Sequence, residues 1–257
     1  MRKIALIIVL YSLCLGLNGC SQVAGSSGSG TETIKPTPVT NDVAAINLKL
    51  GIEYLQLGEY EKSLSKLQKA READQNYPPT YNTLGVLYQR LGDKVKAEEF
   101  YKHALRLNGS DASTLNNYGL FLCKEARFDE AEASFLKAAN NPLYATPEIA
   151  LSNAGTCAMA QSKLDTAETH FRSALEKNPR VAVALIQMAQ ISYATINYLS
   201  ARAYLQRYLE INPHTAKSLW LGIRIERELG DKNALSSYKL LLRNKFPDSK
   251  EVSLLKN

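Results

Sequence analysis

The side chains that could do chemistry in this chain are its four cysteines and three histidines. His103, His170 and His214 lie far apart in the sequence. No HExxH, GxSxG or CxxC motif and no phosphate-binding glycine loop occurs among the residues. Acidic pairs such as Glu98-Glu99 are typical of solvated helix faces. We therefore expect no catalytic residue, no metal site and no cofactor, with a hydrolase of unrecognised site as the enzyme alternative.

Cys20 ends a segment with the features of a signal peptide, predicted over residues 1–19. Arg2 and Lys3 precede an apolar stretch from Ile4 to Leu17, and about 14 residues are too few to span a bilayer, which needs about 20. The segment closes with the sequence LNGC, which resembles the lipobox of bacterial lipoproteins. That resemblance implies that Cys20 carries palmitate-type acyl chains and becomes the first mature residue. An uncleaved anchor, or a secreted protein with an incidental cysteine, is the alternative.

The residues after Cys20 predict where the protein is held. Two or more acyl chains give stable anchoring. In the enterobacterial sorting system that the lipobox resembles, aspartate after the cysteine marks inner-membrane retention, so Ser21 at that position implies the outer membrane. Residues 20–42 are rich in Gly, Ser, Thr and Pro without an apolar period, which predicts a flexible linker with a reach of roughly 25 Å. We expect an outer-membrane, lipid-anchored protein that faces the periplasm.

Composition excludes two further classes. Hydrophobic residues make up 45% of the 257 residues and charged residues 22%, which is typical of a globular rather than a disordered chain. Without the signal peptide, 29 basic and 25 acidic residues leave a net charge of +4. This charge is too small and scattered to predict nucleic-acid binding.

Apolar residues recur at helical spacing from residue 43 onward, and the pattern repeats about every 34 residues. A small residue occupies its eighth position: Gly51, Gly85, Gly119, Gly155, Ala189 and Gly222. A second small residue follows twelve positions later, as in Ala97 and Ala131, where two helices of a hairpin would cross. The pattern resembles the tetratricopeptide repeat (TPR). It predicts an all-α, right-handed superhelical solenoid of about six repeats over residues 43–250, with a tail at 251–257.

Cys123 and Cys157 fall on the first helices of adjacent repeats, which are neighbours in such a stack. An exported protein meets an oxidising compartment, so a disulfide between them is favoured, and two separately buried thiols are the alternative.

The concave surface of the solenoid would be lined mainly by first helices. Candidate partner-binding residues are those at groove-facing positions in the first three repeats, although the apolar ones fit a core role equally well. Asn82 and Asn116 occupy equivalent positions and could bond the backbone of an extended peptide. The candidate groove comprises Leu48, Ile52, Leu55, Asn82, Val86, Gln89, Asn116 and Leu120.

Two stretches make the resemblance more specific. The first is NNYGLFLCKEARFDEAEASFLKAANNPLY, from Asn116 to Tyr144, and the second is SNAGTC, from Ser152 to Cys157. The last residues of the first stretch belong to an insertion that interrupts the 34-residue period. With the lipobox and linker they resemble, over essentially the whole chain, the type IV pilus biogenesis and stability lipoproteins, which are TPR pilotins of outer-membrane secretins.

The resemblance implies a non-enzymatic assembly factor whose partner is the secretin subunit of the type IV pilus machinery. It implies no small-molecule substrate. A periplasmic TPR scaffold for cell-wall enzymes, or for another secretion system, is the alternative within the binding class.

Overall fold

The computed structural model describes residues 42–256, and within them every regular element is a helix. The predicted signal peptide, Cys20 and the linker up to Asn41 lie outside the described residues. The helices are α1 (Asp42–Gln56), α2 (Tyr60–Ala73), α3 (Pro78–Leu91), α4 (Lys94–Leu107), α5 (Ala112–Lys124), α6 (Phe128–Ala139), α7 (Pro147–Ala160), α8 (Leu164–Lys177), α9 (Ala182–Ala194), α10 (Tyr198–Leu209), α11 (Ala216–Leu229), α12 (Lys232–Lys245) and α13 (Lys250–Ser253), followed by a 3₁₀ turn at Leu254–Lys256.

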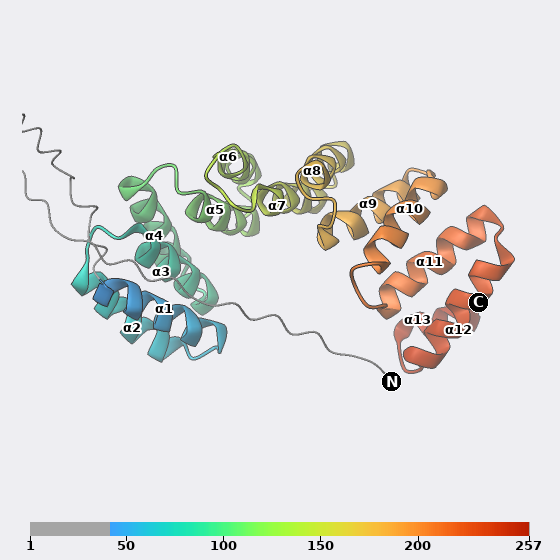
Figure 1. Cartoon of the computed structure of the whole chain (residues 1–257), viewed down its shortest axis with the longest axis horizontal. Helices are drawn as coiled ribbons and strands as arrows, with labels where there is room; N and C mark the ends of the chain where they lie inside the picture. Colours follow the sequence, from blue (N-terminus) through green and yellow to red (C-terminus); the bar gives the residue numbers. More distant parts are fainter. Residues whose placement is uncertain (1–41, 257) are drawn as a thin grey trace, which may run out of the picture. The chain divides into compact units, whose positions relative to one another are not determined.

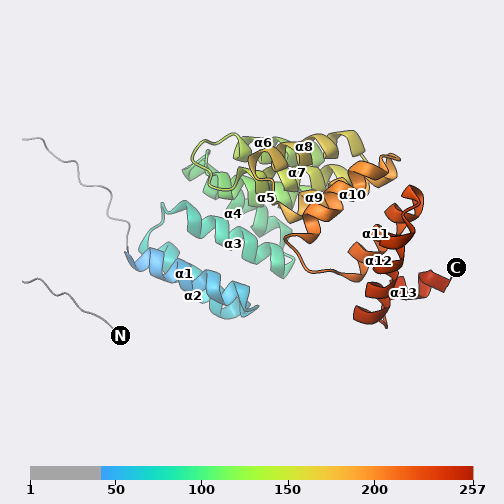
Figure 2. The same cartoon turned by 45° about the vertical axis from the view of Figure 1, so that its right-hand side comes forward.

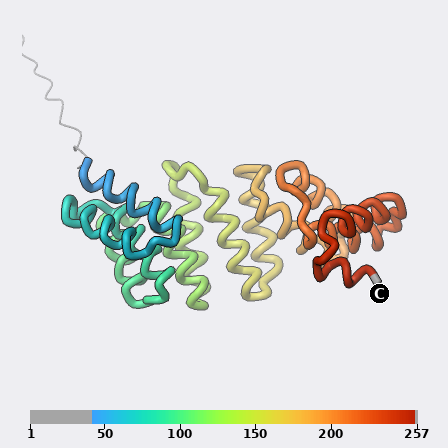
Figure 3. The backbone as a smooth tube through the Cα atoms, turned by 90° about the horizontal axis from the view of Figure 1, so that it is seen from below, coloured from blue at the N-terminus to red at the C-terminus, as the bar shows by residue number. Residues whose placement is uncertain are grey.

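The helices pair into six hairpins that follow one another in chain order (Figures 1 and 2). Each first helix packs on its own second helix and also contacts the first helix of the next hairpin, as α3 does with α4 and α5. The tube view shows the hairpins as successive units (Figure 3). This arrangement confirms the all-α repeat fold expected from the period.

The small residue at the eighth position lets the two helices of each hairpin approach closely. A Cβ atom built on Gly85 would lie 2.7 Å from the ring of Tyr101, and one on Gly155 would lie 2.8 Å from the ring of Phe171. Both rings are fully buried. A real side chain does not tolerate such distances, so the close crossing requires glycine in these hairpins.

The turn inside each hairpin contains one residue in the left-handed backbone region. Glycine serves in three turns, at Gly58, Gly92 and Gly230, where a positive φ costs little. The other three turns use residues with a Cβ atom: Ala126, Ser162 and Ile196, with φ of 60°, 59° and 64°. Their positions keep the repeat period, so the turn geometry recurs even where its preferred residue does not.

The end of the chain differs from the predicted tail. Residues 250–256 form α13 and the 3₁₀ turn, and Val252 and Leu255 pack against the cluster built on Leu219, Ile223 and Leu242. A terminal hairpin has no following repeat to cover its apolar side. The short helix α13 therefore caps the last hairpin. Its apolar residues are too few to show a helical period, so the sequence did not predict this helix.

Within residues 42–256, no helix combines the length and apolar character that crossing a membrane requires.

Candidate functional site

The surface formed by the first helices of the four middle hairpins carries very little charge. Together α3, α5, α7 and α9 contain three charged residues, Arg90, Lys124 and Glu148, whereas α4 alone contains six. Their exposed or half-buried side chains are mostly amides, hydroxyls and aliphatic groups, such as Gln190, Thr156 and Ile149. Such a surface suits a partner segment that is itself nearly uncharged, because burying an unpaired charge is costly.

Asparagine pairs join successive first helices along this surface. The Nδ2 amide of Asn117 donates to Oδ1 of Asn82 at 3.0 Å, and that of Asn153 donates to Oδ1 of Asn116 at 2.9 Å. Among the described residues, no hydrogen bond engages Nδ2 of Asn82 or of Asn116. Each pair therefore ties two repeats together, and the half-buried Asn82 keeps an amide group able to donate to a partner.

A hollow of about 310 Å³ lies between α3 and α5. Val86 and Leu120 supply its apolar lining, and Leu120 is 41% exposed. The buried phenol of Tyr101 donates to Oε1 of Gln89 at 2.8 Å, and burial raises the pKa of that phenol well above its ordinary value, so it remains a donor. The hollow is lined by Val86, Gln89, Arg90, Tyr101, Asn117 and Leu120.

The structure brings five of the predicted groove residues to this surface: Ile52, Asn82, Val86, Gln89 and Leu120 are half-buried or exposed. Leu48 and Leu55 are instead core residues, 7% and 5% exposed, in a cluster with Leu67, Leu84 and Leu87. The structure gives these two leucines the core role that the sequence left equally open, because α3 covers their side of α1.

Asn116 also departs from the prediction, since it is only 7% exposed and bonds to the next repeat rather than pointing freely into the groove. Sequence reasoning did not place Asn117, Arg90 and Tyr101 at the site. The recurrence of an amide at the sixth repeat position, in Asn117, Asn153 and Gln187, is the signal that could have found the first of these.

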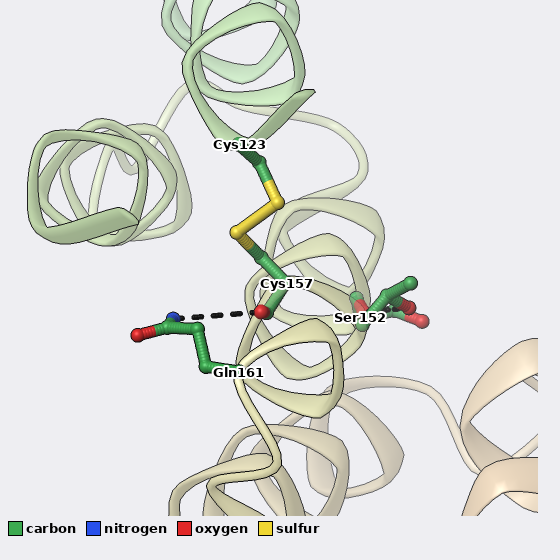
Figure 4. Close-up of a disulfide and its surroundings, with 5 residues drawn as sticks. Cys123, Ser152, Cys157 and Gln161 are labelled. Atoms are coloured by element: carbon green, nitrogen blue, oxygen red, sulfur yellow. Dashed lines mark hydrogen bonds between the residues drawn. A yellow bond between two sulfur atoms is a disulfide. The ribbon is translucent and has the colours of Figure 1, made fainter. Parts of the chain in front are cut away.

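Cys123 of α5 and Cys157 of α7 are joined by a disulfide, with Cα atoms 5.9 Å apart (Figure 4). Cys157 is 4% exposed, and its carbonyl oxygen accepts a hydrogen bond from Gln161 at 3.4 Å. The bond links adjacent first helices on either side of the insertion, as the repeat positions favour. It fixes how the third and fourth repeats stack beside the groove.

A polar network holds the second repeat to the third. Glu98 of α4 accepts hydrogen bonds from Tyr118 at 2.9 Å and from Arg127 at 2.6 Å, and it pairs with Lys102 at 2.8 Å. Partial burial raises the pKa of Glu98, but the hydrogen bonds from Lys102, Arg127 and Tyr118 outweigh it and lower that pKa to about 2. Burial and the Glu98 carboxylate raise the pKa of Tyr118 to about 12.

The histidines do not come together. Nε2 of His170 lies 2.7 Å from Glu132 on the second-helix side, His103 stacks on Tyr81 with ring centroids 4.0 Å apart, and His214 lies before α11. In residues 42–256 no three His, Cys, Asp or Glu side chains are grouped closely enough to hold a metal ion.

Comparison with known proteins places these features in a family. Models of the tetratricopeptide repeat match residues 42–108 and 153–216. The type IV pilus assembly protein PilF of Pseudomonas aeruginosa is 30% identical over 243 residues, which span 95% of this chain and 94% of that protein.

Two solved structures are similar along most of their length. The structure of Pseudomonas aeruginosa PilF superposes with a TM-score of 0.76 at 29% identity, covering 84% of this chain and 98% of that one. The crystal structure of PilW, described as a widely conserved type IV pilus biogenesis factor, gives 0.73 at 29% identity, covering 84% and 99%. The chain therefore belongs to the family of tetratricopeptide-repeat proteins of type IV pilus biogenesis.

Proposed function

We propose that this protein is a non-enzymatic pilotin: an outer-membrane lipoprotein, anchored through Cys20 and facing the periplasm, that assembles the secretin of the type IV pilus. The relationship to PilF over nearly the whole chain carries the proposal. The charge-poor surface of the first helices α3, α5, α7 and α9, with the amide group of Asn82 facing it, supports it as the place where a secretin segment binds. The groove would hold an extended stretch of the secretin subunit, with Val86 and Leu120 taking apolar side chains.

The anchor is tested by fractionation. Cys20→Ala removes the acylation site, so we expect the variant to leave the outer-membrane fraction for the soluble periplasm. Secretin multimers should then fail to reach the outer membrane. Unchanged fractionation of the variant would overturn the anchor.

The groove is tested by the double variant Asn82→Ala with Asn116→Ala. Each substitution removes the acceptor of one inter-repeat hydrogen bond, which contributes roughly 0.5–1.5 kcal/mol. We expect an unchanged helical circular-dichroism spectrum, a modestly lower melting temperature, and reduced secretin assembly and surface piliation.

A matched control removes two amides from second helices, Gln68→Ala with Gln206→Ala, both exposed. The control should assemble secretin normally. If the asparagine variant also does so, while substitutions on the outer face of the last two repeats abolish assembly, the groove is misplaced. Co-purification from solubilised membranes identifies the partner, and recovery of a cell-wall synthase instead of secretin would favour the scaffold alternative.

A further inference from the structure

Positive charge is concentrated at the C-terminal end of the solenoid. Residues 42–178 contain 16 basic and 18 acidic side chains, whereas residues 179–257 contain 12 basic and 6 acidic ones. The small net charge of the mature chain is therefore unevenly distributed: residues 42–178 are nearly neutral, and residues 179–257 are basic.

The ion pairs show the same division. Six of the 16 cations in residues 42–178 form an ion pair, as Lys94 does with Glu125 and Lys96 does with Asp93. In the last two repeats of the described chain, the ion pairs all involve Arg202, which binds Glu226 and Asp231. No cation from Lys232 to Lys250 forms an ion pair with a described residue, so their charge is available to an external partner.

Helix α12 arranges three of these cations along one line. Lys232, Lys239 and Arg243 are seven and four residues apart, which places them within about 40° of one another around a helix with 3.6 residues per turn. We call Lys232, Lys239 and Arg243 the basic stripe. Lys232 and Arg243 are exposed, Lys239 is half-buried, and α12 contains no acidic residue.

An apolar residue lies beside the stripe. Leu240 is 60% exposed, while the side of α12 away from Leu240 contributes Leu235 and Leu242 to the terminal core, which Phe246 joins directly after the helix. Cations with a neighbouring exposed leucine are typical of helices that lie on a lipid surface, where the charges meet phosphates and the leucine enters the interface. The acids near the stripe are Asp231, which caps the start of α12 and pairs with Arg202, and Asp248 and Glu251, which follow α12.

We propose that the basic stripe of α12 docks on the anionic phospholipid headgroups of the leaflet in which the protein is anchored. This inference rests on the proposed lipid anchor, because tethering confines α12 near the leaflet and strengthens a contact that the charges also make on their own. Each cation raises affinity for an anionic surface about fivefold, so three raise it roughly a hundredfold. Held at both ends, the solenoid would lie along the membrane rather than hang from its tether.

The test uses the mature chain with Cys20→Ala, so that no acyl chain contributes, and sediments it with phosphatidylcholine vesicles with or without phosphatidylglycerol. We expect binding only to the vesicles with phosphatidylglycerol, and loss of that binding at high salt. The triple variant Lys232→Glu, Lys239→Glu and Arg243→Glu should bind at least a hundredfold more weakly. The neutral triple Lys232→Gln, Lys239→Gln and Arg243→Gln, which disturbs folding less, should also lose binding.

The matched control reverses three exposed lysines of other second helices, Lys69→Glu, Lys137→Glu and Lys177→Glu, for the same change in net charge. It should bind as the parent does. Equal binding of parent and stripe variants, or equal loss in the control, would overturn the proposal. Retained vesicle binding with loss of a co-purified protein would show that the stripe docks a protein instead. The anchor is judged separately, by fractionation of Cys20→Ala.

Discussion

At the scale of single residues, the chain tolerates unfavourable backbone where the repeat geometry requires it. Ile196 occupies the left-handed position of its turn with φ of 64°, although a β-branched residue is disfavoured there. Its side chain is 72% exposed and so gains little from packing. The turn is retained because the helices on both sides of it are fixed by the core.

Replacing this residue by glycine should therefore stabilise the protein. In Ile196→Gly the left-handed penalty of about 1–2 kcal/mol disappears, and the added backbone entropy of the unfolded chain cancels part of the gain. We expect a net increase of roughly 0.5–1 kcal/mol in the free energy of unfolding, measured by urea denaturation. The control Ala194→Gly, in the last turn of α9, should destabilise instead, and a loss of stability in Ile196→Gly would contradict the strain.

Glu98 makes a second prediction, for acid stability. Its pKa falls from an ordinary 4.5 to about 2 in the folded protein, so its stabilising effect is complete above pH 4.5 and is lost as the pH falls toward 2. Glu98→Gln should lower stability at neutral pH by roughly 1–2 kcal/mol, because Arg127 and Lys102 lose a charged acceptor. It should also flatten the decline of melting temperature from pH 5 to pH 3.

The control for this carboxylate is Glu61→Gln on α2, an exposed residue without an ion pair to any described side chain. Its melting temperature should follow that of the parent across the same pH range. An equally steep decline in Glu98→Gln would mean that other carboxylates dominate acid unfolding.

At the scale of elements, the hairpin depends on a small residue facing a large one. In the fourth hairpin this is Gly155 against Phe171, and in the fifth it is Ala189 against Leu205, both members of these pairs being buried. The glycines face a ring or, as Gly51 does with Leu67, a leucine, whereas the alanine of the fifth hairpin faces a leucine. Alanine is thus paired with the smaller of the two kinds of partner.

Gly155→Ala should destabilise the protein by roughly 1–3 kcal/mol, since its Cβ would force the Phe171 ring from its place. The double variant Gly155→Ala with Phe171→Leu imitates the fifth hairpin. A double-mutant cycle should give a favourable coupling energy between the two substitutions. Strictly additive losses would show that the hairpin relaxes by moving the helices apart.

The hairpins could be predicted from the sequence because each is a local unit with its own small-residue and apolar positions. The groove was harder to predict, since its lining depends on how neighbouring repeats turn against each other. Leu48 and Leu55 have the same repeat positions as Asn82 and Gln89. In the first pair those positions are covered by α3, and in the second they line the concave surface. Position in the period therefore does not by itself determine exposure.

At the scale of the whole molecule, stability is shared along the stack, and the disulfide supports its middle. The two-residue insertion between the third and fourth repeats falls within the loop that Cys123 and Cys157 close. Asn141 also fastens the loop, donating to the carbonyl of Ser110 at 2.6 Å. The point where the period breaks is thus held by a covalent bond as well as by packing.

Removing the disulfide should lower the free energy of unfolding by up to about 4 kcal/mol, which is the chain-entropy estimate for a loop of 34 residues. We expect the double variant Cys123→Ala with Cys157→Ala to melt at a lower temperature than the oxidised parent. A reductant should lower the melting temperature of the parent toward that of the variant and leave the variant unchanged. Two free thiols after alkylation of the unreduced protein, detected by intact mass, would exclude the bond in solution.

The disulfide also has a mechanical consequence. If the chain is pulled from its two ends in an optical trap, hairpins away from the bond release their full contour length as they unfold. The segment between Cys123 and Cys157 cannot extend while the bond is intact. The 34 residues between the two cysteines would span about 120 Å when fully extended, and the intact bond removes that length from the measured extension. With a reductant present, the extension trace should show an additional step of that length. The fully unfolded oxidised protein is therefore shorter under force than its number of residues implies.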